Sequence, residues 1–559
     1  MSTEAIAAID ETATAGRVAL APRVEREPAA GLAETSASAA AVLPPPNVPT
    51  RQGATAKHIR GSSLLLAGRV LSVGINFLVQ VLTVRYLSKA DYGAFAYALV
   101  LVTFLSSLTA LGLDKAASRF VPLYHEEGRH ARMFGAMLFC LITMLAMGLA
   151  VTLLLLGLVG SLGQYVVDDS LSRSLLMVLI ALAPVEALDR LFGKLVAVFC
   201  HPSAIFLRRH VVGPCLKLAA VLFLVLFEAN VYFLAAAYVV AGALGVALYG
   251  HILLRTLRQQ GLLDAFGWRR LELPIKEMLA FGIPVCGTDA LWLLRGTVAV
   301  VLLGYFHSTA GVAALRAALV VAGMNKVVFE SFQFLFLPHA ARLLARNDRA
   351  GINDLYWQTS AWIAVLSYPS FVVSFALAGP VLTLLYGPRY ADSGLVLAIL
   401  SLGYFLNAAL GFNAQTLKVF GRVRWMLAID VGSFLVLLGL HLLLIPPFGA
   451  VGGAIAACSG LLLYNFLNQL ALLRIDGMQF FPRRYWSLYG TMLLGAAAAA
   501  AVQIIIRPPW YLGVASAATI TIGVLGLNRH VLDAAGTFPE LLRSKLLKRM
   551  VGGRKEGLR

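Results

Sequence analysis

Long apolar blocks, separated by short clusters of charged and turn-forming residues, recur along most of the chain. Residues 64–84 and 133–160 are examples, and each is long enough to cross about 30 Å of hydrocarbon at about 1.5 Å of rise per residue. The pattern predicts an all-α polytopic membrane protein with about fourteen transmembrane helices. The expected spans are 64–84, 92–113, 133–160, 174–199, 210–227, 231–254, 277–304, 311–336, 356–379, 393–413, 425–445, 450–472, 486–506 and 511–528.

A weak internal repeat predicts how these spans are organised. The stretch from Tyr86 resembles the stretch from Tyr305, and with a one-residue gap Gly93 falls on Gly311. Six spans separate the two copies, so both have the same orientation, as in transporters built from parallel repeats. We therefore expect two pseudo-symmetric six-helix lobes plus two extra C-terminal helices.

The expected domain boundaries follow from this organisation. Residues 1–60 are rich in Ala, Thr, Glu and Pro and contain no apolar block, which predicts a disordered cytoplasmic tail. The other expected parts are a first lobe at 61–256, a cytoplasmic linker at 257–275, a second lobe at 276–474, the two extra helices at 475–530 and a basic cytoplasmic tail at 531–559.

Composition supports a membrane protein, and the charge distribution predicts its topology. Only 13% of the 559 residues are charged, 59% are apolar and the mean hydropathy is +0.80, which leaves too little charge to cover a water-soluble surface. The net charge of +18 comes from Lys and Arg that gather in alternate connections, roughly thirty in one set and about five in the other. This asymmetry predicts that the richer set, which includes Arg208, Lys418 and Arg422, faces the cytoplasm with both termini, and that the poorer set, which includes Arg85, Lys89 and Arg389, faces outward. It also argues against nucleic acid as a partner.

No pattern in the sequence predicts a cofactor or a catalytic site. The five cysteines lie in spans or at their ends and lack the spacing of a metal or redox site. A GxxxxGK[ST] phosphate loop is missing, which argues against ATP hydrolysis. Connections between spans are at most about twenty residues long, too short for a folded soluble domain, so the protein is not expected to be an enzyme and its site should lie between helices.

Two stretches carry motifs of a known transporter family. Residues 68–98 end a helix in the pattern R-Y-L-S-x-x-D-Y-G. Residues 385–456 contain a Y-G-x-x-Y turn (Tyr386, Gly387, Tyr390), a Q-x-x-x-x-x-G-R step (Gln415, Gly421, Arg422) and the turn Ile445-Pro446-Pro447-Phe448-Gly449. With these motifs in helix order, the chain resembles the Wzx-like polysaccharide-biosynthesis flippases of the multidrug/oligosaccharidyl-lipid/polysaccharide (MOP) exporter superfamily.

The resemblance implies a function and a location. It implies a flippase that moves undecaprenyl-pyrophosphate-linked oligosaccharides across the bacterial inner membrane for exopolysaccharide, O-antigen or capsule synthesis. The implied partners are the lipid-linked glycan, membrane lipids, and the polymerase and glycosyltransferases of the same pathway. A lipid II flippase and a multidrug antiporter of the same superfamily remain alternatives, and a membrane polysaccharide polymerase or ligase is a weaker one because the outer connections are short.

Several ionisable residues lie well inside the expected spans, where each costs on the order of 3 kcal/mol at the centre of a helix and therefore needs a reason. Cations outnumber anions among them, which suits an anionic phosphate or pyrophosphate headgroup in a wet central cavity. The candidate cavity cations are Arg69, Arg190, Lys194, Lys217, Arg295, Arg316 and Lys326.

The carboxylates inside the spans suggest a second role. Glu186, Asp289 and Asp430 are candidates for coupling transport to an ion, because a carboxylate in a low dielectric can exchange a proton near neutral pH. An alternative is structural: Glu186 with Arg190, and Lys326 with Glu330, are spaced four residues apart and can pair on one helix face.

Overall fold

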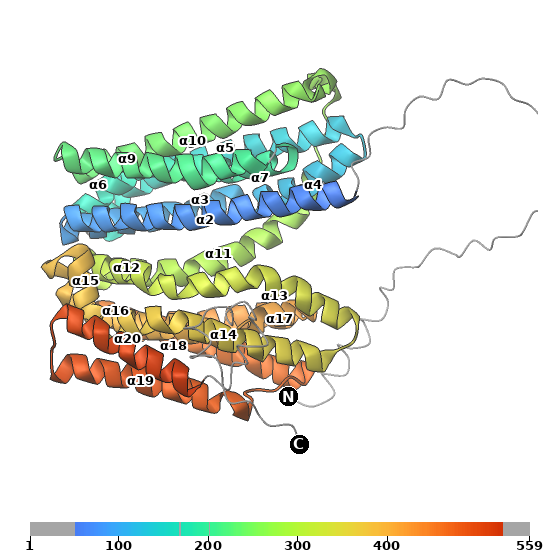
Figure 1. The fold of residues 1–559 in the computed structure, drawn as a ribbon. Helices are drawn as coiled ribbons and strands as arrows, with labels where there is room; N and C mark the ends of the chain where they lie inside the picture. The colour runs from blue at the N-terminus through green and yellow to red at the C-terminus, as the bar shows by residue number, and fades with distance from the viewer. Residues whose placement is uncertain (1–50, 167–168, 201, 529–559) are drawn as a thin grey trace, which may run out of the picture. The chain divides into compact units, whose positions relative to one another are not determined.

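The computed structural model describes residues 51–166, 169–200 and 202–528, and within them the chain is helical with short connections (Figure 1). Helix α2 begins at Arg51, earlier than the apolar pattern predicts. Residues 1–50 of the predicted tail at 1–60, and the whole predicted tail at 531–559, lie outside the described residues.

The helices up to residue 259 pack mainly with one another and form the first group. This group contains α2 (Arg51–Tyr86), α3 (Lys89–Ala110), α4 (Leu113–Glu126), α5 (His130–Val166), α6 (Ser170–Leu179), α7 (Leu182–Phe199), α8 (Pro202–Ile205), the π-helix η2 (Phe206–Val212), α9 (Gly213–Leu226) and α10 (Val231–Gln259). Two short 3₁₀ turns, η3 (Leu262–Ala265) and η4 (Trp268–Arg270), follow it.

The remaining helices form the second group, and its first two members pack against both groups. Its elements are α11 (Ile275–Phe306), α12 (Thr309–Gly323), η5 (Met324–Lys326), α13 (Val327–Ala345), α14 (Arg349–Ala376), α15 (Ala378–Tyr386), η6 (Pro388–Ser393), α16 (Gly394–Ala409), α17 (Asn413–Val419), α18 (Val423–Asp476), η7 (Arg483–Tyr485), α19 (Trp486–Ile505) and α20 (Trp510–Leu527). In Figure 1, α11 runs between the blue-to-green first group and the yellow-to-red helices.

Eleven helices of the described part of the chain are long and apolar enough to cross a membrane. The predicted span 174–199 is not among them, because its C-terminal part, α7, carries four charged residues. The predicted span 64–84 lies in α2, whose side chains are described only from Gly68 onward. The predicted spans 425–445 and 450–472 fall together in the 54-residue α18. An all-helical, multi-pass membrane protein is confirmed, and the total of fourteen crossings stays a prediction.

Helix α18 is interrupted at the turn that the sequence predicts. Gly449 has φ 55° and ψ −131°, a conformation that favours glycine, and it follows Pro446 and Pro447. The chain folds back there, since a Cβ on Gly452 would lie 1.9 Å from the Leu444 carbonyl oxygen. His307 Nε2 donates to the Ile445 carbonyl oxygen at 2.7 Å, which satisfies an acceptor that the broken helix leaves without its usual partner.

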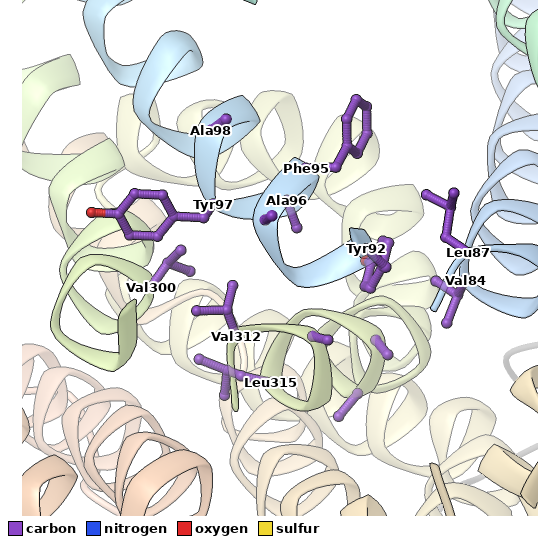
Figure 2. Close-up of a cluster of buried hydrophobic side chains, with 14 of the residues drawn as sticks. Val84, Leu87, Tyr92, Phe95, Ala96, Tyr97, Ala98, Val300, Val312 and Leu315 are labelled. Atoms are coloured by element: carbon purple, nitrogen blue, oxygen red, sulfur yellow. The ribbon is translucent and has the colours of Figure 1, made fainter. Parts of the chain in front are cut away.

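The two helices that share the sequence repeat, α3 and α12, pack on each other. A Cβ on Gly93 would lie 1.9 Å from the Thr309 carbonyl oxygen, so glycine permits this close approach. Figure 2 shows Tyr97 of α3 beside Val300 of α11, with Val312 and Leu315 of α12 nearby in the same buried cluster. The repeat therefore marks the packing surface that joins the two groups.

Helices α19 and α20 pack against each other and against α14 (Figure 1). Tyr368 of α14 donates to the Met492 carbonyl oxygen at 2.9 Å. Many large apolar side chains face outward, including Leu154 on α5 at 62% exposed and Ile505 on α19 at 79%. A surface of this kind is unfavourable in water and suits contact with lipid.

Candidate functional site

A cavity of about 550 Å³ lies among α11, η5, α13, α16, α17 and α18. Its volume falls in the range of about 300–1,000 Å³ that is typical of small-molecule sites. The charged side chains in its wall are Arg295, Lys326, Glu330 and Asp430. The aromatic ones are Trp292, Phe329, Tyr404 and Tyr464, and the amides are Gln333, Asn407, Asn413, Gln415 and Asn465.

Arg295 of α11 is tied to the first half of α18. Its Nη2 donates to the Asp430 carbonyl oxygen at 2.9 Å and to the Ser433 hydroxyl at 2.8 Å, and lies 3.3 Å from Asp430 Oδ1. The guanidinium also lies 4.8 Å from the centre of the Tyr464 ring. A predicted cavity cation and a predicted coupling carboxylate are therefore partners of each other.

Lys326 of η5 lies over an aromatic ring and pairs with no carboxylate of the described residues. Its Nζ is 4.0 Å from the centre of the Tyr404 ring, a cation–π contact. Glu330, one helical turn further on, pairs with Arg69 of α2 instead. The spacing of four residues would allow Lys326 to pair with Glu330, but Glu330 pairs with Arg69, which is 261 positions away from it in the sequence.

The four charged side chains of the cavity wall balance, two positive and two negative. Glu330 and Asp430 are each paired with an arginine, Arg69 and Arg295. Lys326 is therefore the wall cation without a carboxylate partner in the described residues, and its ammonium group keeps unused hydrogen-bond donors.

Glu186 and Arg190 of α7 share a partner in α3 rather than pairing with each other. The Ser106 hydroxyl donates to Glu186 Oε2 at 2.8 Å, and Arg190 donates to the Ser106 carbonyl oxygen at 2.5 Å. These charges join α7 to α3 in the first group.

The other predicted residues lie apart from the cavity wall. Lys194 and Lys217 are exposed, and Lys217 Nζ lies 5.5 Å from the Tyr238 ring centre. Asp289 of α11 pairs with Lys115 of α4 at 2.5 Å. Arg316 of α12 has a buried Nε without a partner in the described residues, close enough to Tyr92 of α3 for an electrostatic interaction.

Of the seven predicted cations, the structure brings Arg295 and Lys326 to the cavity, and Arg69 reaches its edge through Glu330. Arg190, Lys194, Lys217 and Arg316 are not part of its wall. The binding and coupling roles of all these residues stay predictions.

Sequence reasoning missed the amide side chains of the cavity. Asn413 Nδ2 donates to Asn465 Oδ1 at 2.8 Å, and Asn465 Nδ2 donates to Asn407 Oδ1 at 2.9 Å. These three asparagines, the amide triad, come from α16, α17 and the second half of α18. The sequence did contain a signal for them, because all three are polar residues within the predicted apolar spans 393–413 and 450–472.

An ion pair inside the first group was also missed. Arg208 of η2 is buried, and its Nη2 donates to Asp189 Oδ1 of α7 at 2.6 Å. The charge count assigned Arg208 to a cytoplasmic connection, although its side chain packs against Gly245 of α10.

Polar contacts join the two groups at the end where the sequence predicts the outer face. Lys89 of α3 pairs with Asp392 of η6 at 2.7 Å. Arg389 of η6 donates to the Val84 carbonyl oxygen of α2 at 2.9 Å, and Arg85 donates to the Leu384 carbonyl oxygen of α15 at 3.5 Å. We call these contacts the outer junction.

Comparisons with known proteins agree with this architecture. The chain is 21% identical over 418 residues to the uncharacterized membrane protein MJ1068 of Methanocaldococcus jannaschii, covering 72% of this chain and 82% of that protein. The fold is similar to the lipid II flippase MurJ in an inward closed conformation, with a TM-score of 0.65, 12% identity and coverage of 87% of this chain and 100% of that one. It is also similar to a multidrug resistance MATE transporter of the MOP superfamily in an inward-facing conformation, with a TM-score of 0.58, 14% identity and coverage of 73% and 95%.

A family model described as polysaccharide biosynthesis protein matches residues 58–338, half of the chain. The matched segment runs from α2 through the first group to α13, and so includes Lys326 and Glu330 of the cavity. The fold is similar to that of these transporters. The chain belongs to the polysaccharide biosynthesis protein family.

Proposed function

We propose that the protein is a flippase that moves an undecaprenyl-pyrophosphate-linked oligosaccharide from the cytoplasmic to the outer leaflet of the bacterial inner membrane. The observation that carries this proposal is a cavity whose Lys326 has no carboxylate partner in the described residues. A pyrophosphate group is anionic and rich in acceptors, and an ammonium group in a partly desolvated site binds it strongly.

The position of the cavity supports entry from the cytoplasm. Asn413 and Gln415 of its wall stand at the start of α17, just before the basic connection with Lys418 and Arg422 that the sequence assigns to the cytoplasmic side. The outer junction holds the opposite end of the two groups together. Transport then requires the junction to open while the cytoplasmic side closes, as in alternating access.

A lipid II flippase is the second candidate, and the similarity to MurJ over the whole of that chain favours it. Both substrates present a pyrophosphate and sugars on a long lipid, so the cavity chemistry suits either one. A multidrug antiporter for cations fits less well, because the unmatched charge in the cavity is positive.

Deletion of the gene tests the proposal. We expect lipid-linked oligosaccharide repeat units to accumulate on the cytoplasmic face, and the intact gene to clear them, whereas a Lys326→Ala gene should not. Rescue of cells depleted of their lipid II flippase would instead establish the second candidate. Normal glycan export in the deletion strain would refute the proposal.

A further inference from the structure

Most charged and neutral polar groups of the cavity wall stand on different segments, although α13 contributes both Glu330 and Gln333. Arg295 and Asp430 stand on α11 and the first half of α18, whereas the amide triad stands on α16, α17 and the second half of α18. Lys326 contacts the segment that carries the amides, because Tyr404, whose ring it lies over, is on α16, three residues before Asn407. A phosphate needs only the charged part, so the neutral part calls for another explanation.

The amide triad is fixed by hydrogen bonds within the protein. Asn465 Nδ2 donates both to Asn407 Oδ1 and to the Leu461 carbonyl oxygen, at 2.9 Å each. Asn413 Nδ2 donates to Asn465, and Asn413 Oδ1 accepts from the Ala414 amide at 2.8 Å. Asn413 and Asn465 are 3% and 2% exposed, so their orientation is held by burial as well.

This arrangement leaves one group of the triad unused. Because Asn407 Oδ1 accepts from Asn465, the Asn407 amide nitrogen points elsewhere, and it donates to no group of the described residues. Asn407 is half-buried and lines the cavity, so its two N–H donors are available to a ligand. Gln415, which belongs to the Q-x-x-x-x-x-G-R motif, also lines the cavity and makes no hydrogen bond within the described part of the chain.

The neutral part of the wall suits a sugar. Sugar hydroxyls accept and donate hydrogen bonds, which amides match without requiring charge on the ligand. A sugar ring also has an apolar face, and Trp292, 73% exposed on α11, offers an aromatic surface in the same cavity. A preorganised donor costs little ordering entropy when the ligand binds.

We propose that the amide triad, with Gln415, forms a subsite for the sugar that is attached directly to the pyrophosphate. Asn407 Nδ2 donates to a hydroxyl or ring substituent of that sugar, while Lys326 binds the phosphate. This inference rests on the proposed function, since it divides one substrate between two parts of one cavity.

The binding of two lipids to the purified full-length protein distinguishes the phosphate site at Lys326 from the sugar subsite. The probes are undecaprenyl pyrophosphate and the same lipid carrying one hexose or one N-acetylhexosamine, and the measured quantity is the ratio of their dissociation constants. We expect the wild-type protein to prefer the sugar-bearing lipid. Asn407→Leu should reduce this preference about threefold to tenfold and leave the affinity for undecaprenyl pyrophosphate unchanged.

Two further variants keep the test interpretable. Gln415→Leu leaves the triad intact and should give a smaller loss of preference, so it replaces Asn407→Leu if that protein fails to fold. Asn468→Leu is the matched control, because Asn468 of α18 donates to the Tyr464 carbonyl oxygen and does not line the cavity. Its ratio should equal that of the wild type.

The outcomes distinguish the two proposals. Failure of the wild-type protein to bind either lipid would overturn the proposed function. Binding of both lipids with equal affinity, or a wild-type preference that survives in both Asn407→Leu and Gln415→Leu, would overturn the sugar subsite and leave the flippase proposal standing.

Discussion

Charged residues lie inside both groups of helices, but they are used differently. In the first group, Asp189 pairs with Arg208, and Glu186 and Arg190 are both held by Ser106. In the cavity of the second group, Lys326 has only the face of Tyr404 as a partner in the described residues. The paired charges of the first group join helices, whereas we propose that the cavity keeps Lys326 available for a ligand. The same residue type inside a membrane can thus have either role, and only its partners distinguish them.

The largest effect on stability is expected at the Arg208–Asp189 pair of the first group. Arg208→Met leaves the Asp189 carboxylate, which is 38% exposed, without its partner and should lower the free energy of unfolding by about 1.5–3 kcal/mol. The measurement is the thermal unfolding temperature in detergent. The double variant Arg208→Met with Asp189→Leu should recover most of the loss, and a double variant as unstable as the single one would contradict the structural role.

Substitution of the cavity lysine should reduce transport and leave stability almost unchanged. Lys326→Ala removes a charged interaction with the substrate that is worth about 1.5–3 kcal/mol, which corresponds to a loss of affinity of roughly tenfold to a hundredfold. In the deletion strain, the Lys326→Ala gene should restore less glycan export than the wild-type gene, and the Lys326→Arg gene should restore part of it. The unfolding temperature of Lys326→Ala protein should stay near that of the wild type. A marked drop in stability without a specific loss of transport would place Lys326 with the structural charges.

The contact between the groups offers a third test. Gly93→Ala places a Cβ against the Thr309 carbonyl oxygen and should destabilise the protein by about 1–3 kcal/mol. Gly74→Ala is the matched control, because nothing lies within 4 Å of a Cβ there. If the two variants unfold at the same temperature, the close approach of α3 and α12 is wrong.

The smallest effect is expected at the outer junction. The Lys89–Asp392 pair is partly exposed, so Lys89→Ala should change the free energy by only about 0.2–1 kcal/mol. Even this change shifts the balance between closed and open forms of the outer end. Leu382→Cys, at a buried position of α15, should react with a water-soluble thiol reagent somewhat faster when it is combined with Lys89→Ala, and an unchanged rate would argue that the pair does not hold the outer junction closed.

Part of this comparison could be predicted from the sequence. Hydrophobic blocks locate most of the helices, because a span must be long and apolar, and the Pro-Pro-x-Gly turn locates the break in α18. Arg295 and Lys326 were also identified, since an ionisable residue in an apolar block needs a reason.

The partners of the charges could not be predicted. Glu330 lies four residues from Lys326, but it pairs with Arg69, which is brought near only by packing of distant helices. The amide triad was missed for a related reason: a single asparagine in an apolar block is a weak signal, and its meaning depends on three helices that meet at one point. Helix location is local information, whereas the content of a cavity is not.

The most direct test of the account is translocation by the purified protein in liposomes. Undecaprenyl-pyrophosphoryl hexose is placed in the membrane, and a membrane-impermeant enzyme that modifies the sugar reports how much lipid reaches the outer leaflet. The account predicts that the wild-type protein makes the inner-leaflet pool accessible, and that Lys326→Ala protein does so at least about tenfold more slowly. Equal rates for Lys326→Ala and wild type, or no translocation above protein-free liposomes, would contradict it.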